Sequence, residues 1–361
     1  MPDLYLGLIS GTSLDAIDAA VVDFSGTPHV TAARSYPLED DLRRGALDAM
    51  AGGGQVSLAQ LGELDHRFAI AFSEAARRLL SDHDIAADDI SAIGSHGQTI
   101  WHAPEGDHPS TLQIGDPSLL AALSGIPVVA DFRRKDMAVG GQGAPLASGW
   151  HREIFSHLAP VAIINLGGIA NITLLESDAT KGFDTGPANG LMDAWAYKHG
   201  KGSFDADGEF ASDGEFIPAL LDRLLADPYF ALPPPKSTGK EVFNLSWLDA
   251  FLEGSERSAD VQATLCELTA RTVADAINAS KARHAILMGG GVHNPLLRER
   301  LAANLSIATL ETADQHGFDP DFIEAACFAW LARQRLAEQP GNVPDVTGAA
   351  SETVLGGIYL P

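Results

Sequence analysis

The sequence predicts an α/β fold, because two kinds of segment alternate along the chain. Short apolar runs bounded by Gly or Asn are typical of buried strands, and longer segments with apolar residues at helical spacing lie between them. The chain has 361 residues, of which 45% are hydrophobic and 20% are charged. This length and composition indicate a globular protein of two domains or one large one.

The expected elements follow in chain order. We expect strands over residues 4–9, 19–24, 126–130, 161–165, 169–175 and 284–288. Helical spacing predicts helices over 58–80, 117–123, 145–157, 190–199, 260–280, 295–305 and 319–336. The segment 227–244 is rich in Pro and polar residues, which predicts a loop near a cleft.

One pattern occurs twice at long range. A strand, a glycine-bearing turn and a second strand occupy residues 4–24, and the same order returns at 161–175. This repetition suggests a duplicated α/β unit in which each copy opens with a hairpin. A chance echo of common hairpin chemistry is an equally good explanation on this evidence.

Charge and cysteine content limit the classes of partner. The chain carries 48 acidic and 24 basic side chains, a net charge of -24. Such a field repels nucleic acid and anionic membranes, and the densest basic run is only Arg133 to Lys135. Cys266 and Cys327 are too few for a disulfide framework, and the first residues lack a secretory signal. We therefore expect a cytoplasmic protein with neither a nucleic-acid nor a membrane partner.

The first hairpin turn is a candidate phosphate site. It contains the consecutive residues Gly11, Thr12, Ser13, Leu14, Asp15, Ala16, Ile17 and Asp18. Glycine lets successive amide groups converge on an anion, and Ser and Thr hydroxyls add donors. Asp15 and Asp18 would oppose a bare phosphate but suit magnesium bound with a nucleotide. The alternative is a plain turn whose polar side chains satisfy their own backbone.

Two further glycine-bearing turns are of the same kind. The second hairpin offers Asn165, Gly167, Gly168 and Asn171, and a strand end delivers Gly289, Gly290 and Gly291 to a helix start at Asn294. Two facing clamps of this type would suit a nucleotide. Simple packing of small residues is the alternative, and no P-loop or dinucleotide fingerprint is present.

Asp184 lies in the segment FDTGPANG, beside a Gly-Pro turn that precedes an expected helix. A carboxylate held at a rigid turn is well placed to act as a general base. Helix capping or an Asx-turn is the commoner role of such an aspartate.

Polar stretches at residues 95–99, 115–118 and 131–146 are candidates for a pocket. They bring His96, Gln98, Arg133 and Gln142, which suit a sugar-like ligand with hydroxyl, amide and carboxylate groups. His96, His102 and His108 are evenly spaced, but the spacing fits no known zinc pattern.

Taken together, the motifs resemble the anhydro-N-acetylmuramic acid kinases of the actin and sugar-kinase superfamily. The matching segments, in the family's order over nearly the whole chain, are GLISGTSLDAID, SHGQT, DFRRKDMAVGGQGAPL, INLGGIANIT, FDTGPANGLMD, MGGGVHNPLL and EAACFAWLA. Each motif alone is weak, but seven in order are specific. Ala16 and Ala188 stand where the family pattern usually has Gly.

The resemblance implies two ribonuclease-H-like domains with ATP and magnesium in an interdomain cleft. We expect the first domain at 1–130 plus about 343–361 and the second at 131–342. The implied reaction opens the anhydro ring of the sugar with water while the six-position oxygen takes the γ-phosphoryl group of ATP. A kinase for another amino sugar and a silent sugar- or nucleotide-binding regulator are the alternatives.

The resemblance also implies roles for the candidate residues and a homodimer. Asp184 would activate the water, Gly11 to Asp18 with Gly167 and Gly168 would hold the phosphates, and Gly289 to Gly291 would lie near the adenosine. Asp15 and Asp18 would reach the magnesium. Arg133 would bind the carboxylate of the lactyl group, with Glu324 also near the sugar.

Overall fold

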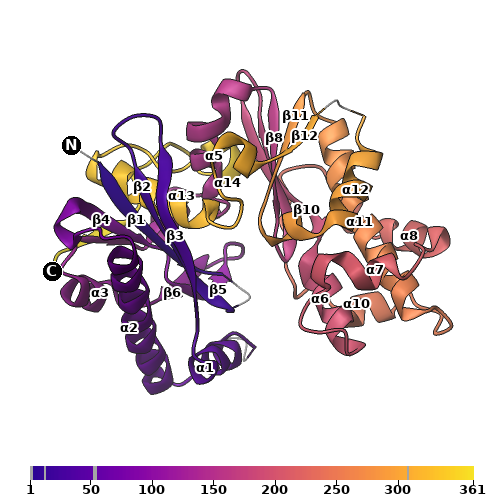
Figure 1. Ribbon diagram of the computed structural model, residues 1–361, viewed down its shortest axis with the longest axis horizontal. Helices are drawn as coiled ribbons and strands as arrows, with labels where there is room; N and C mark the ends of the chain where they lie inside the picture. Colours follow the sequence, from indigo (N-terminus) through magenta and orange to yellow (C-terminus); the bar gives the residue numbers. More distant parts are fainter. Residues whose placement is uncertain (1–2, 12–13, 52–54, 307–308) are drawn as a thin grey trace. The chain divides into compact units, whose positions relative to one another are not determined.

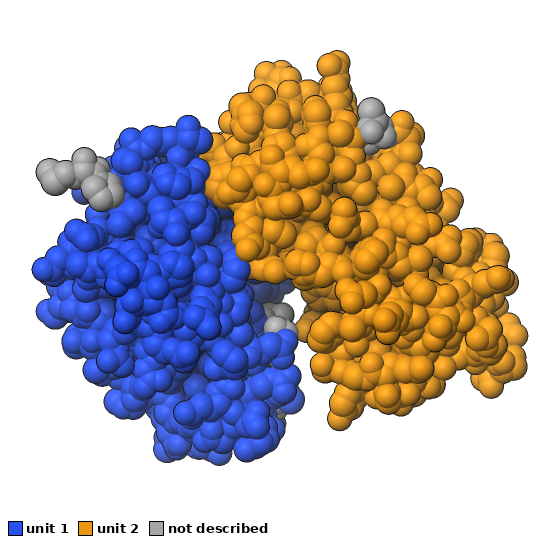
Figure 2. Space-filling model, viewed as in Figure 1, with its two compact units in different colours: residues 1–150, 322–361 blue, residues 151–321 orange. Residues whose placement is uncertain are grey.

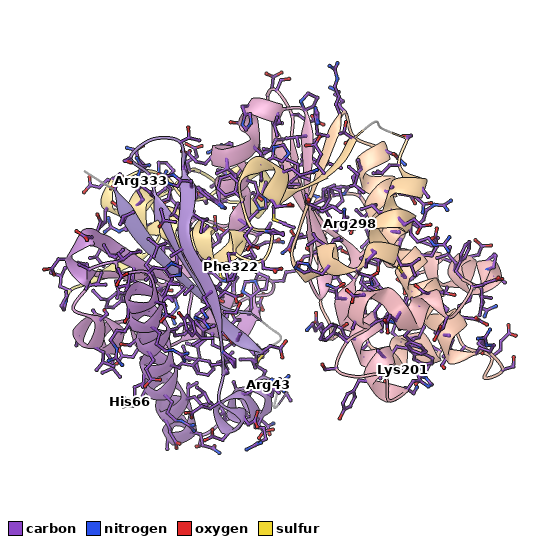
Figure 3. All side chains as sticks on the ribbon, in the orientation of Figure 1. Arg43, His66, Lys201, Arg298, Phe322 and Arg333 are labelled. Atoms are coloured by element: carbon purple, nitrogen blue, oxygen red, sulfur yellow. The ribbon has the colours of Figure 1, made fainter. Side chains whose placement is uncertain are left out.

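The computed structural model describes residues 3–11, 14–51, 55–306 and 309–361. The chain forms two compact units, coloured separately in Figure 2: residues 1–150 with 322–361, and residues 151–321. Phe322, labelled in Figure 3, marks the point where the chain re-enters unit 1. Each unit has its own hydrophobic core.

Unit 1 is built on a mixed sheet with the strand order β13-β7-β4-β1-β2-β3. Strands β1 to β4 of this sheet are labelled in Figure 1. Strands β1, β4 and β7 are parallel, and β2 is antiparallel to both neighbours. Its elements are β1 (Leu4–Ser10), β2 (Ala16–Asp23), β3 (His29–Pro37), α1 (Asp40–Ala51), α2 (Leu58–Asp82), β4 (Ile90–Ser95), β5 (Gln98–Ala103), β6 (Ser110–Ile114), α3 (Pro117–Ser124), β7 (Val128–Ala130), α4 (Phe132–Ala138), α13 (Ile323–Leu336), α14 (Pro344–Thr347) and β13 (Gly357–Tyr359).

Unit 2 repeats this topology in the order β10-β9-β8-β11-β12, with β9 antiparallel to both neighbours. If the strands are renumbered within each unit, starting at β1 and at β8, both sheets contain the strand order 3-2-1-4-5 of ribonuclease-H-like domains. The hairpin that occurs twice in the sequence therefore marks a duplicated unit. Helix α5 (Ala147–Phe155) leads into it. Its elements are β8 (Val161–Leu166), β9 (Ile169–Leu175), β10 (Thr180–Pro187), α6 (Asn189–Lys198), α7 (Glu209–Ser212), α8 (Pro218–Leu225), α9 (Pro228–Ala231), α10 (Leu245–Asp249), α11 (Ser258–Asn278), β11 (His284–Met288), α12 (Pro295–Asn304) and β12 (Thr309–Thr312).

Helices cover both faces of the unit 1 sheet. Alternate β1 residues Leu4, Leu6 and Leu8 join a core with residues of α2, whereas Gly7 faces α13. A side-chain carbon at Gly7 would overlap Ala325 O, so only glycine lets the backbone of α13 approach this closely. Among the described residues, no helix is both long enough and apolar enough to cross a membrane.

The unit boundaries differ from the expected ones at residues 130 and 343. Residues 131–150 and 322–342 belong to unit 1, because α13 packs on β1 and β4. Asp136 in α4 accepts hydrogen bonds from Asn342 Nδ2 and Thr347 Oγ1, both at 2.8 Å. These contacts join α4 to the C-terminal segment, although more than 200 residues separate them in the sequence.

Candidate active site

The first hairpin turn is closed by backbone contacts. Leu14 N donates to Gly11 O at 3.1 Å, and Leu14 is fully buried with a left-handed φ of 57°. Thr12 and Ser13 lie outside the described residues. Ala16 begins β2 without a positive φ, so alanine in place of the family's usual glycine carries no left-handed strain there.

The two carboxylates of this hairpin already have protein partners. Arg43 of α1, labelled in Figure 3, donates to Asp15 at 3.1 Å, and Ser35 Oγ donates to Asp18 at 2.5 Å. In the described part of the chain, no three His, Cys, Asp or Glu side chains form a group that could hold a metal ion. A magnesium ion would therefore need ligands from a nucleotide besides these aspartates.

In unit 2, the second hairpin turn meets the N-terminus of α6. Gly167 O accepts from Asn189 N at 3.0 Å, and Gly168 O accepts from Ala188 N and Gly190 N, both at 3.1 Å. Ala188 has a φ of -132°, so alanine in place of the family's usual glycine takes no left-handed conformation here. The turn is thus held by its carbonyl groups.

The glycine triplet packs against this same turn. Met288 at the end of β11 pairs in register with Asn165 of β8, and a 3₁₀ turn over Gly290–His293 leads to α12. A side-chain carbon at Gly289, whose φ is 78°, would overlap Asn165 Oδ1. The structure therefore brings Asn165, Gly167, Gly168 and the triplet together at the carboxyl ends of parallel strands, where open α/β sheets commonly bind ligands.

Lys240 is a cation at this turn that the sequence analysis missed. A side-chain carbon at Gly168 would lie 2.5 Å from Lys240 Cε and 3.2 Å from its Nζ, so the lysine lies across the turn. Its only sequence signal is its position in the expected loop 227–244, which gives no indication of the long-range contact. The lysine supplies positive charge beside the second glycine turn.

Asp184 lies within β10, at a register irregularity in its pairing with β9. Its Oδ2 accepts from Thr238 N at 2.9 Å and from Ser237 Oγ at 3.2 Å. Its backbone is also fixed, since Asp184 N donates to Lys236 O at 3.0 Å and Tyr229 Oη donates to Asp184 O at 2.8 Å. The carboxylate therefore caps no helix, and the N-cap of α6 is Ala188.

Burial raises the pKa of Asp184 to about 6, although the hydrogen bonds from Thr238 and Ser237 act in the opposite direction. A carboxyl group with this pKa is a stronger base than an exposed aspartate and is still ionised near neutral pH. This combination of fixed orientation and raised basicity is suited to activating a water molecule.

In unit 1, His96 and Arg133 form a rigid pair. His96 Nδ1 lies 2.9 Å from Gly97 O, which can only accept, so Nδ1 carries the proton. The unprotonated Nε2 then accepts from Arg133 Nε at 3.1 Å and from Nη2 at 2.8 Å. Burial, followed by the Arg133 charge, holds the pKa of His96 well below its ordinary range, consistent with a neutral ring.

Arg133 has donor capacity beyond these bonds. Its Nη1 donates to Gly143 O at 2.7 Å, and Nη1 and Nη2 each carry a second hydrogen. The charge of Glu324, in the first turn of α13, acts on Arg133. His96, Arg133 and Glu324 are thus neighbours in unit 1.

The other two proposed sugar residues differ in exposure. Gln142 is half-buried in a loop whose backbone donates to Thr347 O at 2.7 Å. Gln98 is fully buried, and its Nε2 donates to Thr99 O at 3.0 Å. In this structure, Gln142 is therefore the more accessible of the two glutamines.

Comparisons with known proteins show the family of this chain. The family model for anhydro-N-acetylmuramic acid kinase matches residues 3–361. This chain belongs to that family. The anhydro-N-acetylmuramic acid kinase of Xanthomonas campestris pv. campestris (strain 8004) is 50% identical over 99% of this chain and 97% of its own length. That of Pasteurella multocida (strain Pm70) is 46% identical over 98% and 96%, respectively. The resemblance seen in the motifs is thereby confirmed for this member of the anhydro-N-acetylmuramic acid kinase family.

Proposed function

We propose that this protein is an ATP-dependent kinase that opens 1,6-anhydro-N-acetylmuramic acid with water and yields N-acetylmuramic acid 6-phosphate and ADP. The observation that carries the proposal is the position of Asp184, a half-buried base oriented by two donors within a chain of this family. We further propose that it acts in the cytoplasm as a homodimer, in the recycling of cell-wall sugar.

The bond changes balance with a single base. Asp184 takes a proton from water as the water oxygen bonds to the anomeric carbon, and the bond from that carbon to the six-position oxygen breaks. The released oxygen bonds to the γ-phosphorus while the bond to the ADP oxygen breaks. The leaving group of ring opening is therefore the nucleophile of phosphoryl transfer.

Phosphate binding is assigned to both hairpin turns. Gly11 to Asp18 in unit 1, and Gly167, Gly168 and Asn171 in unit 2, would face the phosphate groups, with Lys240 adding a cation. Asn165 and Gly289 to Gly291 would hold the adenosine side of the site. Magnesium, when bound with ATP near Asp15 and Asp18, would supply charge stabilisation at the transferred phosphoryl group.

Sugar binding is assigned to unit 1. The end-on edge of Arg133 can grip the lactyl carboxylate bidentately, because its other edge is already occupied by His96. Gln98, Gln142 and Glu324 complete the proposed set. Of these, Glu324 is exposed in the first turn of α13 and can accept from a sugar hydroxyl.

Mass spectrometry in oxygen-18 water tests the reaction. The protein is incubated with ATP, magnesium and the anhydro sugar, and the product is analysed before its anomeric oxygen exchanges. Phosphorylated sugar with the label at the anomeric hydroxyl supports coupled ring opening and transfer. Phosphorylation without the label would point to a kinase of ordinary hydroxyl acceptors, and ATP binding without any product would point to a regulator.

The activity should depend on pH through Asp184. A general base works only when ionised, so kcat/KM should rise with pH, by up to tenfold per unit, until it levels off above the raised pKa of about 6. Steady-state rates from about pH 5 to 8 check this. A profile that levels off near the ordinary pKa of aspartate would contradict the role of burial.

Replacing Lys240 with Ala should raise the KM for ATP by about 5- to 30-fold, because a charged contact to phosphate contributes roughly 1–2 kcal/mol. The KM for the sugar should change little. Lys201→Ala, which removes another exposed lysine of unit 2 (Figure 3), is the matched control. Equal effects of the two variants would show that only overall charge matters.

A further inference from the structure

Strand β10, which carries Asp184, lies at one edge of the sheet that the structure describes in unit 2. The outer N–H and C=O groups of an edge strand have no neighbouring strand, so they need other partners when they are buried. At Asp184 both backbone groups have one. Asp184 N donates to Lys236 O at 3.0 Å, and Asp184 O accepts from Tyr229 Oη at 2.8 Å. The segment 229–236 therefore replaces a neighbouring strand at this residue.

The pairing of β10 with β9 is irregular at the same place. Its register shifts between Asp184 and Gly186, and such an irregularity interrupts the ladder of backbone hydrogen bonds. Phe230 packs against Gly186, because a side-chain carbon at this glycine would lie only 2.8 Å from Phe230 Cε1. Tyr229 and Phe230, consecutive residues of α9, thus contact β10 at the two residues that flank the irregularity. Helix α9 restrains the strand where its own pairing does not.

Tyr229 is itself held by several contacts. It is 9% exposed, its backbone N donates to Asp227 Oδ1 at 2.9 Å, and its ring meets Phe243 edge to face with centroids 5.3 Å apart. Lys236 Nζ lies 4.5 Å from the ring centroid and donates to Tyr229 O at 3.1 Å. Burial, followed by the charge of Asp184, raises the pKa of Tyr229, so the hydroxyl keeps its proton and acts as the donor to Asp184 O.

Asp184 is therefore held by two separate sets of bonds. Thr238 N and Ser237 Oγ bind its carboxylate, which restrains the rotation of the side chain. Tyr229 Oη and Lys236 O bind its backbone, which fixes the point from which that side chain extends. A base must lie within hydrogen-bond reach of the proton that it takes, so both sets matter for proton transfer.

We propose that Tyr229 is a positioning residue of the reaction, whose hydroxyl fixes the backbone of Asp184 and thereby the place of the carboxylate. The inference rests on the proposed function, because Tyr229 acts only through Asp184 as the base. Its hydroxyl binds a peptide carbonyl and takes no part in the proton transfer itself.

The test is Tyr229→Phe, which removes only the hydroxyl and keeps the buried ring. The rate of sugar phosphorylation, measured by product formation, should show a kcat about 10- to 50-fold lower. This is less than the roughly 10²-fold cost of a 1 Å misplacement, because Thr238 and Ser237 still hold the carboxylate. The KM values for ATP and for the sugar should stay unchanged.

A double-mutant cycle shows whether the effect passes through Asp184. In the background of Asp184→Asn, adding Tyr229→Phe should lower kcat by less than about twofold, because there is no longer a base to position. The pH profile gives a second readout. The kcat/KM of Tyr229→Phe should level off above the same pKa of about 6, since Tyr229 binds the backbone and not the titrating carboxylate.

Thr264→Val is the matched control for lost stability. Thr264 is fully buried in α11 of the same unit, and its Oγ1 donates to Asp260 O at 2.7 Å and accepts from Ile217 N at 2.9 Å. Removing these bonds should lower Tm at least as much as Tyr229→Phe does, without lowering kcat. An equal fall of kcat in both variants would mean that general loosening of unit 2 slows the reaction, and would overturn the proposal.

An unchanged kcat in Tyr229→Phe, an undiminished loss in the Asp184→Asn background or a displaced pH profile would also overturn it. If Asp184→Asn has reduced turnover at the same time, the proposed function stands and only the role of Tyr229 falls. If Asp184→Asn keeps full turnover, the assignment of the base itself is wrong and the inference falls with it.

Discussion

Replacing Asp184 with Asn is expected to lower kcat by about 10²- to 10⁴-fold, the usual contribution of a general base. The amide oxygen of Asn can still accept from Thr238 N and Ser237 Oγ, so the loop should keep its place. ATP binding, measured by calorimetry, should therefore be unchanged, while phosphorylation measured by product formation falls.

The control for this prediction is Asp222→Asn, an exposed carboxylate on α8 of the same unit. It should leave both rate and ATP binding unaltered. Full turnover by Asp184→Asn would remove Asp184 from the mechanism.

Replacing Arg133 with Lys should lower kcat/KM for the anhydro sugar by about 30- to 150-fold, equal to roughly 2–3 kcal/mol for a lost charge-assisted pair of hydrogen bonds. Lysine keeps the positive charge, but its single ammonium group cannot donate to His96, Gly143 O and a carboxylate at the same time. It lacks the planar array of N–H donors that the guanidinium group of arginine provides. The loss should appear mainly in the KM for the sugar.

The substrate itself provides the control. The corresponding anhydro-N-acetylglucosamine lacks the lactyl carboxylate, so Arg133→Lys should cost little with this compound. A similar loss with both sugars would mean that Arg133 supports the fold of the pocket rather than the carboxylate.

Much of the fold could be predicted from local sequence. The expected strands at 169–175 and 284–288 match β9 and β11, because both are short apolar runs bounded by turn residues. Strand β10 was missed, since its sequence TKGFDTGP contains Gly and Pro and is stabilised as a strand by pairing with β9. Strand β3 was missed because it is a largely exposed edge with little apolar alternation.

The candidate site could be predicted only where a short motif by itself determines the local backbone conformation. The glycine turns and Asp184 could be recognised in this way. Ser237, Thr238 and Lys240 could not, because their roles depend on contacts about 50 to 70 residues away in the sequence. The compact units differ in their bounds from the expected domains for a related reason, since the packing of α13 depends on glycines in β1 and β4 that resemble ordinary strand residues.

The segment 236–240 has a consequence for the chemistry beyond its separate contacts. Lys236 O and Thr238 N bind Asp184, and two residues later Lys240 lies across the Gly168 turn. Two residues span at most about 7 Å, so a movement of Lys240 toward an arriving phosphate would pull on the amide that holds the carboxylate. Because the Thr238 bond lowers the pKa of Asp184, loosening it would make the base stronger. With the proposed phosphate contact of Lys240, nucleotide occupancy and base strength would be coupled through five residues of one loop.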